Sequence, residues 1–210
     1  MKGILGIIGA GHLGQQIAHY AILDHHYEKV VFFDDYTTEK EVNDFPILGN
    51  SEIIHSAYEN NLFDELIIGI GYKHLDIRKK MFEQFFDVIP FGKIIHSTSW
   101  VDQTSKIEQG CVIYPRCCID AHVVIDYNSI LNISCTVAHD TIVGKHCFVS
   151  PNVAMAGFIN INEQCIIGIN STIIDNISIV QKTQIGAGTV VIKNIDKAGL
   201  YVGNPQKFIR

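Results

Sequence analysis

The sequence predicts two domains: a small α/β domain with a parallel sheet, followed by a parallel β-helix. Three observations indicate this order. Strand-like and helix-like segments alternate over the first 95 residues, and the helical period disappears after about residue 95. From there an aliphatic residue or Met recurs at every sixth position. We therefore expect a domain of residues 1–95 and a second domain of residues 96–210.

The first domain begins with GILGIIGAG (3–11), an apolar run typical of a buried strand that ends in glycines. The segment HLGQQIAHYAIL (12–23) follows, with Leu13, Ile17 and Ala21 at helical spacing. Further strands are predicted at 29–35 (KVVFFDD) and 64–71 (DELIIGIG), and a second helix at 75–86 (LDIRKKMFEQFF). This alternation predicts a parallel sheet, because helices connect its strands.

The second domain is defined by its six-residue period. The repeating positions are Ile95, Val101, Ile107, Ile113, Ile119, Ile125, Leu131, Val137, Val143, Val149, Met155, Ile161, Ile167, Ile173, Ile179, Ile185 and Val191. A repeat of this length with one aliphatic residue predicts a short strand and a turn per repeat, and three repeats per coil. The aliphatic side chain should point inward and stack on its equivalent in the next coil.

The position two residues before each aliphatic should also point inward, where small side chains fit. Five of the six cysteines occupy it: Cys111, Cys117, Cys135, Cys147 and Cys165. We interpret them as small apolar residues of the interior. No C-x-x-C pair is present, so no metal site is expected. The residue after each aliphatic is often Gly, Ala, Asn or Asp, which predicts that the strained backbone of each corner lies there.

Composition and charge exclude some classes of function. The formal net charge of −6 argues against a nucleic-acid partner, because phosphate binding requires clustered Lys and Arg. No apolar run approaches the roughly 20 residues needed to cross a membrane. The apolar N-terminus lacks the cleavage region of a signal peptide. A cytoplasmic protein with reduced thiols is therefore expected.

The first strand leads into a glycine-rich loop. Gly9, Gly11 and Gly14 fit the spacing G-x-G-x-x-G, with Asp34 and Asp35 following the next strand. By itself this pattern indicates a dinucleotide such as NAD, with the pyrophosphate at a helix N-terminus and an acid on the ribose. However, about four strands make up only half of a dinucleotide-binding fold, and no second half follows.

Several segments together resemble one known group of proteins. They are GAGHLG (9–14), FDD (33–35), IGIGYKHLDIRKK (68–80), LNISCTVAHDTIVG (131–144), IIGINSTI (166–173) and VGNP (202–205). On these segments the chain resembles the left-handed β-helix (hexapeptide-repeat) acyltransferases, over essentially its whole length. It is most similar to the bacterial branch with a small Rossmann-like α/β domain, which includes bacillosamine-pathway N-acetyltransferases and sialic acid O-acetyltransferases.

The resemblance implies a left-handed coil, a homotrimer, and direct transfer of an acetyl group from acetyl-CoA to a nucleotide-linked amino sugar. His139 matches the family's general base, and Asp140 matches the acid that orients it; the alternative for Asp140 is an ordinary solvated side chain. The matching acetyl-CoA-binding residues are Asn132, Phe148, Gly157, Ile169, Gly186 and Ala187. Gly157 would donate its backbone N–H to the oxyanion. Gly11, His12, Gly14, Asp34, Asp35 and Gly71 match the nucleotide-sugar site.

The chain departs from the family pattern at two places. The family's second active-site histidine corresponds to Phe148, and we interpret the nearby His146 as a surface residue. In the glycine loop, His12 is displaced by one position.

The sequence therefore predicts an N-acetyltransferase of a UDP- or dTDP-linked 4-amino-4,6-dideoxy sugar, which would serve surface polysaccharide or glycan synthesis. Three alternatives stay open. They are an O-acetyltransferase of sialic acid or another sugar, a non-catalytic β-helix scaffold that binds nucleotide-sugars, and an NAD-dependent oxidoreductase.

Overall fold

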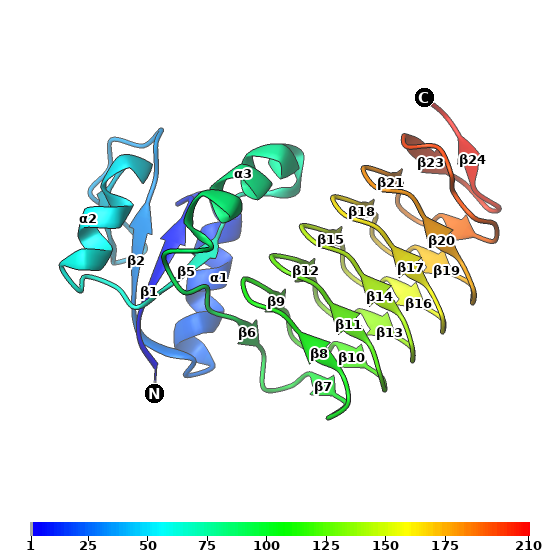
Figure 1. Ribbon diagram of the computed structural model, residues 1–210, viewed down its shortest axis with the longest axis horizontal. Coiled ribbons are helices and arrows are strands. Elements are labelled where there is room, and N and C mark those ends of the chain that lie inside the picture. Colours follow the sequence, from blue (N-terminus) through cyan, green and yellow to red (C-terminus); the bar gives the residue numbers. More distant parts are fainter. Residues whose placement is uncertain (1) are drawn as a thin grey trace. The chain divides into compact units, whose positions relative to one another are not determined.

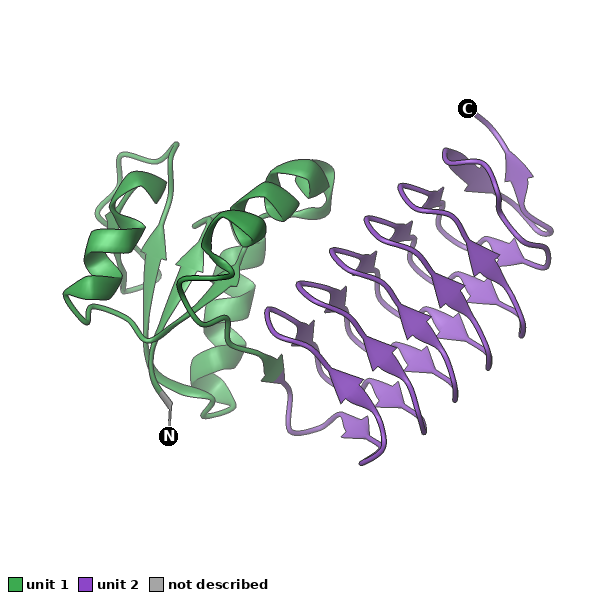
Figure 2. Cartoon of the chain, in the orientation of Figure 1, with its two compact units in different colours: residues 1–94 green, residues 95–210 purple. Residues whose placement is uncertain are grey.

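The structure is a computed structural model that describes residues 2–210. The chain divides into two compact units, residues 1–94 and residues 95–210 (Figure 2). The first unit carries all three α-helices, and the second is built from short strands in successive coils (Figure 1). Among residues 2–210 we find no helix with the length and apolarity that crossing a bilayer requires.

The first unit is a five-stranded sheet in the order β3-β4-β2-β1-β5. The strands are β1 (Lys2–Ile8), β2 (Tyr27–Phe33), β3 (Glu41–Val42), β4 (Phe45–Gly49) and β5 (Glu65–Ile68). The helices are α1 (His12–Leu23), α2 (Ile54–Glu59) and α3 (Leu75–Phe85), with 3₁₀ turns η1 (Ser51–Ile53) and η2 (Tyr72–His74). All pairings are parallel except β3 with β4.

The central position of β1 explains its composition. It pairs with β2 on one side and β5 on the other, so Leu5 and Ile7 are completely buried. The apolar face of α1 is buried as the helical spacing predicted, with Ile17 and Ala21 inaccessible to solvent. The parallel sheet is confirmed. The β3–β4 hairpin and α2 were not predicted, because two residues of strand or six of helix give too short a period to recognise.

In the second unit every repeat forms a two-residue strand, and the strands belong to three parallel sheets (Figure 1). The first sheet contains β7 (Trp100–Val101), β10 (Cys118–Ile119), β13 (Thr136–Val137), β16 (Ala154–Met155), β19 (Thr172–Ile173) and β22 (Val190–Val191). The second contains β8 (Lys106–Ile107), β11 (Val124–Ile125), β14 (Ile142–Val143), β17 (Asn160–Ile161) and β20 (Ser178–Ile179).

The third sheet includes the end of the chain. Its strands are β6 (Ile94–Ile95), β9 (Val112–Ile113), β12 (Ile130–Leu131), β15 (Phe148–Val149), β18 (Ile166–Ile167), β21 (Gln184–Ile185), β23 (Leu200–Val202) and β24 (Lys207–Phe208). Strand β24 is antiparallel to β23, whereas the coil strands pair in parallel. The fold class, an α/β domain followed by a left-handed parallel β-helix, is confirmed.

The interior of the coil follows the predicted register. All the repeating aliphatic residues from Ile107 to Val191 are at most 6% exposed. The position two residues earlier is buried as well, including the five interior cysteines, whereas Cys118 is exposed. Cys135 Sγ lies 3.2 Å from the carbonyl oxygen of Ser150. Burial raises the pKa of the Cys147 thiol well above its ordinary value, which keeps the thiol neutral.

The predicted location of the strained corner backbone was wrong by two residues. Positive φ occurs at the third residue after each aliphatic from Ile107 to Ile185, not at the first. The non-glycine members are Arg116, His122, Asn128, Ser134, Asp140, His146, Asn152, Phe158, Gln164, Asn170, Asn176 and Lys182. The first residue after the aliphatic lies at the end of the strand. Asp120 is an example, and its side chain accepts the backbone N–H of Ala121.

Replacement of Ile161 by Ala should destabilise the protein by about 2–5 kcal/mol, because it opens a cavity in a stacked interior column. The matched control is Asn160→Ala, on the exposed side of the same strand, with an expected effect within about 0.5 kcal/mol. Denaturant unfolding of both variants provides the comparison. Equal destabilisation by the two would contradict the assigned register.

Candidate functional site

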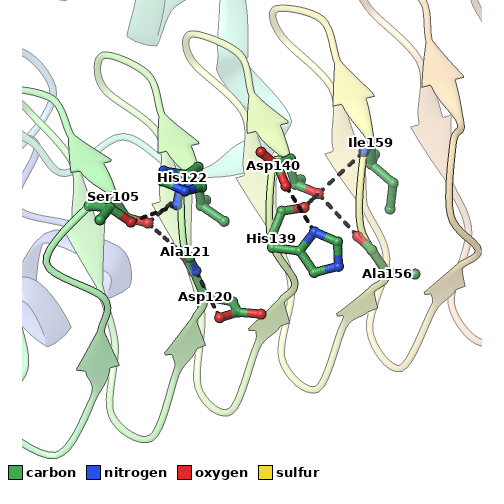
Figure 3. A network of polar contacts seen from close by, with 11 residues as sticks. Ser105, Asp120, Ala121, His122, His139, Asp140, Ala156 and Ile159 are labelled. Atoms are coloured by element: carbon green, nitrogen blue, oxygen red, sulfur yellow. Dashed lines mark hydrogen bonds and ion pairs between the residues drawn. The ribbon is translucent and has the colours of Figure 1, made fainter.

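His139 and Asp140 occupy the corner between β13 and β14 (Figure 3). His139 Nδ1 and Asp140 Oδ2 lie 2.9 Å apart, and the two side chains are 49% and 40% exposed. With Nδ1 protonated and donating to the carboxylate, the lone pair of the neutral imidazole is on Nε2. This arrangement gives an accessible imidazole nitrogen that can accept a proton from a substrate.

Gly157 lies one coil beyond His139 and approaches its ring closely. A Cβ at this position would lie 2.8 Å from His139 Cε1 and 3.0 Å from Nε2. Any side chain would therefore displace the imidazole. The backbone of Gly157 therefore lies next to His139 Nε2, the ring nitrogen that does not contact Asp140.

The backbone N–H of Gly157 is not capped by the side chain before it, in contrast to three other corners of the coil. At three corners, the residue after the repeating aliphatic caps the following N–H: Asp120, Asp126 and Asn132 each accept it at 2.8 Å. Residue 156 is Ala, which has no acceptor to offer. Within residues 2–210 no acceptor is recorded for the Gly157 N–H, so it can donate to an added group.

The residues expected at the acetyl-CoA site do not all lie at this corner. Asn132, Ile169, Gly186 and Ala187 follow β12, β18 and β21, along the corner that precedes the β13-containing sheet. Phe148 begins β15 and is 6% exposed. Of this group, Gly157 lies directly beside the His139 ring.

His146 is not a surface residue, contrary to the sequence prediction. It is 2% exposed, and its Nδ1 lies 3.0 Å from Nδ2 of Asn128, the equivalent residue one coil earlier. The polarity of the side chain favoured the surface, but the hydrogen bond between neighbouring coils satisfies it in a buried position.

The first unit contains a cavity of about 530 Å³ at the ends of β1, β2 and β5. Four of the six residues expected to bind a nucleotide-sugar line it: Gly11, Asp34, Asp35 and Gly71. His12 and Gly14 are not among its lining residues. Gly14 is required for packing, since a Cβ there would lie 1.9 Å from the Gly9 carbonyl oxygen.

Asp34 and Asp35 have different roles in the structure. Asp34 accepts three backbone N–H groups, from Ala10 at 2.7 Å, Tyr36 at 2.9 Å and Thr37 at 3.0 Å. It therefore holds the glycine loop against the loop after β2. Asp35 accepts only the Ser51 N–H through Oδ1, at 2.6 Å, and among the described contacts its Oδ2 has none.

Three further lining residues were not among those predicted to bind the nucleotide-sugar. Tyr36 is 90% exposed and presents an aromatic ring at the cavity, while His74 and Lys80 bring basic side chains from η2 and α3. The N-terminus of α1 begins directly after the lining residue Gly11. Helix N-termini and lysines both favour phosphate oxygens, so the cavity combines features that suit a nucleotide diphosphate. No cluster of three or more metal-binding side chains occurs within residues 2–210.

Comparisons with known proteins agree with this geometry. Residues 5–85 match the family model of the PglD N-terminal domain. Over 166 residues the chain is 27% identical to GDP-perosamine N-acetyltransferase of Escherichia coli O157:H7, covering 74% of this chain and 71% of the relative. The acetyltransferase domain of PglB from Neisseria gonorrhoeae FA1090, in complex with acetyl coenzyme A, has a TM-score of 0.90 and 26% identity, covering 98% of each chain.

The chain is therefore an acetyltransferase similar to these enzymes, and its N-terminal part matches the PglD N-terminal domain. The fold is also shared with PerB from Caulobacter crescentus in complex with CoA and GDP-perosamine, at a TM-score of 0.89 and 24% identity, covering 100% of this chain and 98% of that one. The family resemblance and the enzyme class expected from the sequence, an acyltransferase, are confirmed.

In this acetyltransferase, Asp34→Ala should lower the stability of the first unit by roughly 2 kcal/mol or more, because three N–H groups lose a charged acceptor. Asp35→Ala should have less effect, since it removes one such bond. Denaturant unfolding, monitored with a probe in the first unit, compares the free energies of unfolding of the two variants. If the two variants were equally stable, Asp34 would not hold the loops together.

Proposed function

We propose that the protein transfers an acetyl group from acetyl-CoA to the amino group of a nucleotide-linked 4-amino-4,6-dideoxy sugar. The observation that carries the proposal is the His139–Asp140 pair beside the free Gly157 N–H. An amine acceptor agrees with the sequence relative, which is a GDP-perosamine N-acetyltransferase. The nucleotide expected from the sequence is UDP or dTDP, and the relatives add GDP to the nucleotides that need testing.

The acetyl group passes directly from CoA to the amine, without an acyl-enzyme intermediate. The amine lone pair attacks the thioester carbonyl carbon, a C–N bond forms, and the carbonyl oxygen becomes an oxyanion that the Gly157 N–H stabilises. His139 Nε2 takes a proton from the attacking nitrogen, and Asp140 stabilises the resulting imidazolium. The C–S bond then breaks, and the proton passes to the CoA sulfur.

The nucleotide-sugar binds in the cavity of the first unit. Lys80, His74 and the N-terminus of α1 would neutralise the diphosphate, and the free Oδ2 of Asp35 would accept hydrogen bonds from the base or ribose. Asp34 contributes by holding the two loops that carry these groups. Tyr36 offers an exposed ring at the same cavity.

The active enzyme is a homotrimer, with acetyl-CoA in the groove between neighbouring coils. The acetyl-CoA residues Asn132, Ile169, Gly186 and Ala187 lie on a different corner from His139, so a second chain has to complete the site. The sheet between these corners presents mostly small or apolar side chains outward: Trp100, Cys118, Thr136, Ala154, Thr172 and Val190. Such a face suits packing against another coil.

A cytoplasmic location stays a prediction from the sequence.

Incubation with acetyl-CoA and a panel of UDP-, dTDP- and GDP-linked amino sugars should release CoA thiol with at least one acceptor. His139→Ala should lower kcat by about 10²-fold or more, because proton removal from the attacking amine loses its base. Thiol release and mass spectrometry of the product provide the measurement.

Three other results would overturn the proposal in different ways. Release only with sialic acid or another sugar hydroxyl would establish an O-acetyltransferase. Nucleotide-sugar binding without release would indicate a scaffold. Full activity of His139→Ala would remove this residue as the base.

Ala156→Asn should lower kcat by about 10²-fold, because the introduced amide oxygen would cap the Gly157 N–H as Asn132 caps its neighbour. The matched control is Ile174→Asn, at the same position one coil later, which should retain wild-type kcat. Steady-state kinetics with saturating acetyl-CoA compare the two. Equal kcat values for both variants would show that the oxyanion does not use this N–H.

A further inference from the structure

Phe158 is an outlier among the corner residues. It adopts positive φ (57°), as do eleven other non-glycine corner residues of the coil, and every one of those eleven is polar. The left-handed conformation is disfavoured for residues with a Cβ and is tolerated best by Asn and Asp. Phe158 is also 55% exposed, so burial of its ring does not explain the choice of residue. Unfavourable backbone at an exposed aromatic residue is typical of functional sites.

The ring of Phe158 packs against the imidazole of His139. The two ring centroids lie 5.1 Å apart with an interplanar angle of 87°, which is an edge-to-face contact. The backbone reinforces the contact, since the Phe158 N–H donates to the His139 carbonyl oxygen at 3.1 Å. Phe158 therefore touches the side chain that the proposed reaction uses as its base.

Three neighbours of different kinds restrain the imidazole. Asp140 Oδ2 holds Nδ1 of the ring through a hydrogen bond of 2.9 Å. This bond alone would still allow the ring to tilt. The perpendicular phenyl ring limits that tilt, and the Gly157 backbone limits movement on the side nearest Cε1 and Nε2. Together the three neighbours leave one orientation of Nε2.

We propose that Phe158 is a positioning residue, which holds the His139 imidazole so that Nε2 stays aimed at the acceptor amine. This inference rests on the proposed function for its kinetic test. Small displacements of a catalytic base reduce turnover strongly, since proton transfer requires hydrogen-bond distance and alignment. The disfavoured backbone of Phe158 is retained because a polar corner residue would not restrain the ring.

The test compares Phe158→Asn with two other variants. Phe158→Tyr keeps an aromatic ring, and His122→Asn introduces Asn at the equivalent corner position two coils earlier. Phe158→Asn should raise the thermal midpoint by about 2–4 °C, because Asn tolerates positive φ. It should lower kcat about tenfold or more and leave the KM of both substrates within about twofold. Phe158→Tyr should restore kcat, and His122→Asn should leave kcat unchanged.

Histidine ¹⁵N NMR gives a readout that does not depend on acetyl transfer, with His139→Asn used to assign the signal. In the wild type the Nδ1-protonated tautomer of His139 should dominate, and in Phe158→Asn its fraction should fall. If the wild-type protein acetylates no acceptor, the proposed function fails and this measurement alone decides the role of Phe158.

Two kinetic outcomes would overturn the inference. Unchanged kcat together with an unchanged tautomer ratio in Phe158→Asn would show that the ring positions nothing. A raised KM for the amino sugar at unchanged kcat would make Phe158 a substrate contact instead.

Discussion

Backbone pairing between segments eighteen residues apart is the constraint on which the second unit depends. Thr136 pairs with both Cys118 and Ala154, and the same separation relates the neighbouring strands from β7 to β22. Because each strand has only two residues, none is stable without the strands above and below it. The stacked aliphatic interior holds these pairings in register. An inserted or deleted residue would turn the interior side chains of a coil outward, so the chain between Ile107 and Val191 contains no irregular repeat.

This constraint explains which parts of the structure the sequence could predict. The interior positions follow from the period alone, since one aliphatic per repeat has to face the axis. The closeness of His139 and Gly157 follows in the same way, because eighteen residues separate them. The buried position of His146 could not be predicted, since a histidine at a corner is normally solvated. Its contact with Asn128 helps to satisfy the buried imidazole.

The glycine loop of the first unit illustrates a different limit. Gly9, Gly11 and the following acids line one cavity, whereas Gly14 does not. The spacing predicts a binding role for these residues, which stays a prediction. It did not distinguish Asp34, which binds three backbone N–H groups, from Asp35, which binds one. That distinction depends on how the loop after β2 folds, and the short β3–β4 hairpin that shapes this loop has no recognisable period.

The corner that we propose as the catalytic site contains departures from the repeat. Most corners carry a polar residue at positive φ, and three cap a backbone N–H with Asp or Asn. Phe158 departs from the polar pattern at positive φ, and Ala156 offers no side-chain acceptor on the other side of Gly157. Such local exceptions can be recognised in a repeating fold, because each corner residue can be compared with the residues at the same position in the other coils.

The reversal of the chain at β24 has a consequence for solubility. A stack of parallel strands ends in unpaired backbone groups that could recruit further strands, and this is a recognised route to aggregation. In the third sheet the last strand is antiparallel to β23, only two residues long, and begins with Lys207. A short charged edge of opposite direction is a poor template for another coil, so β24 disfavours further strand pairing at that edge of the sheet.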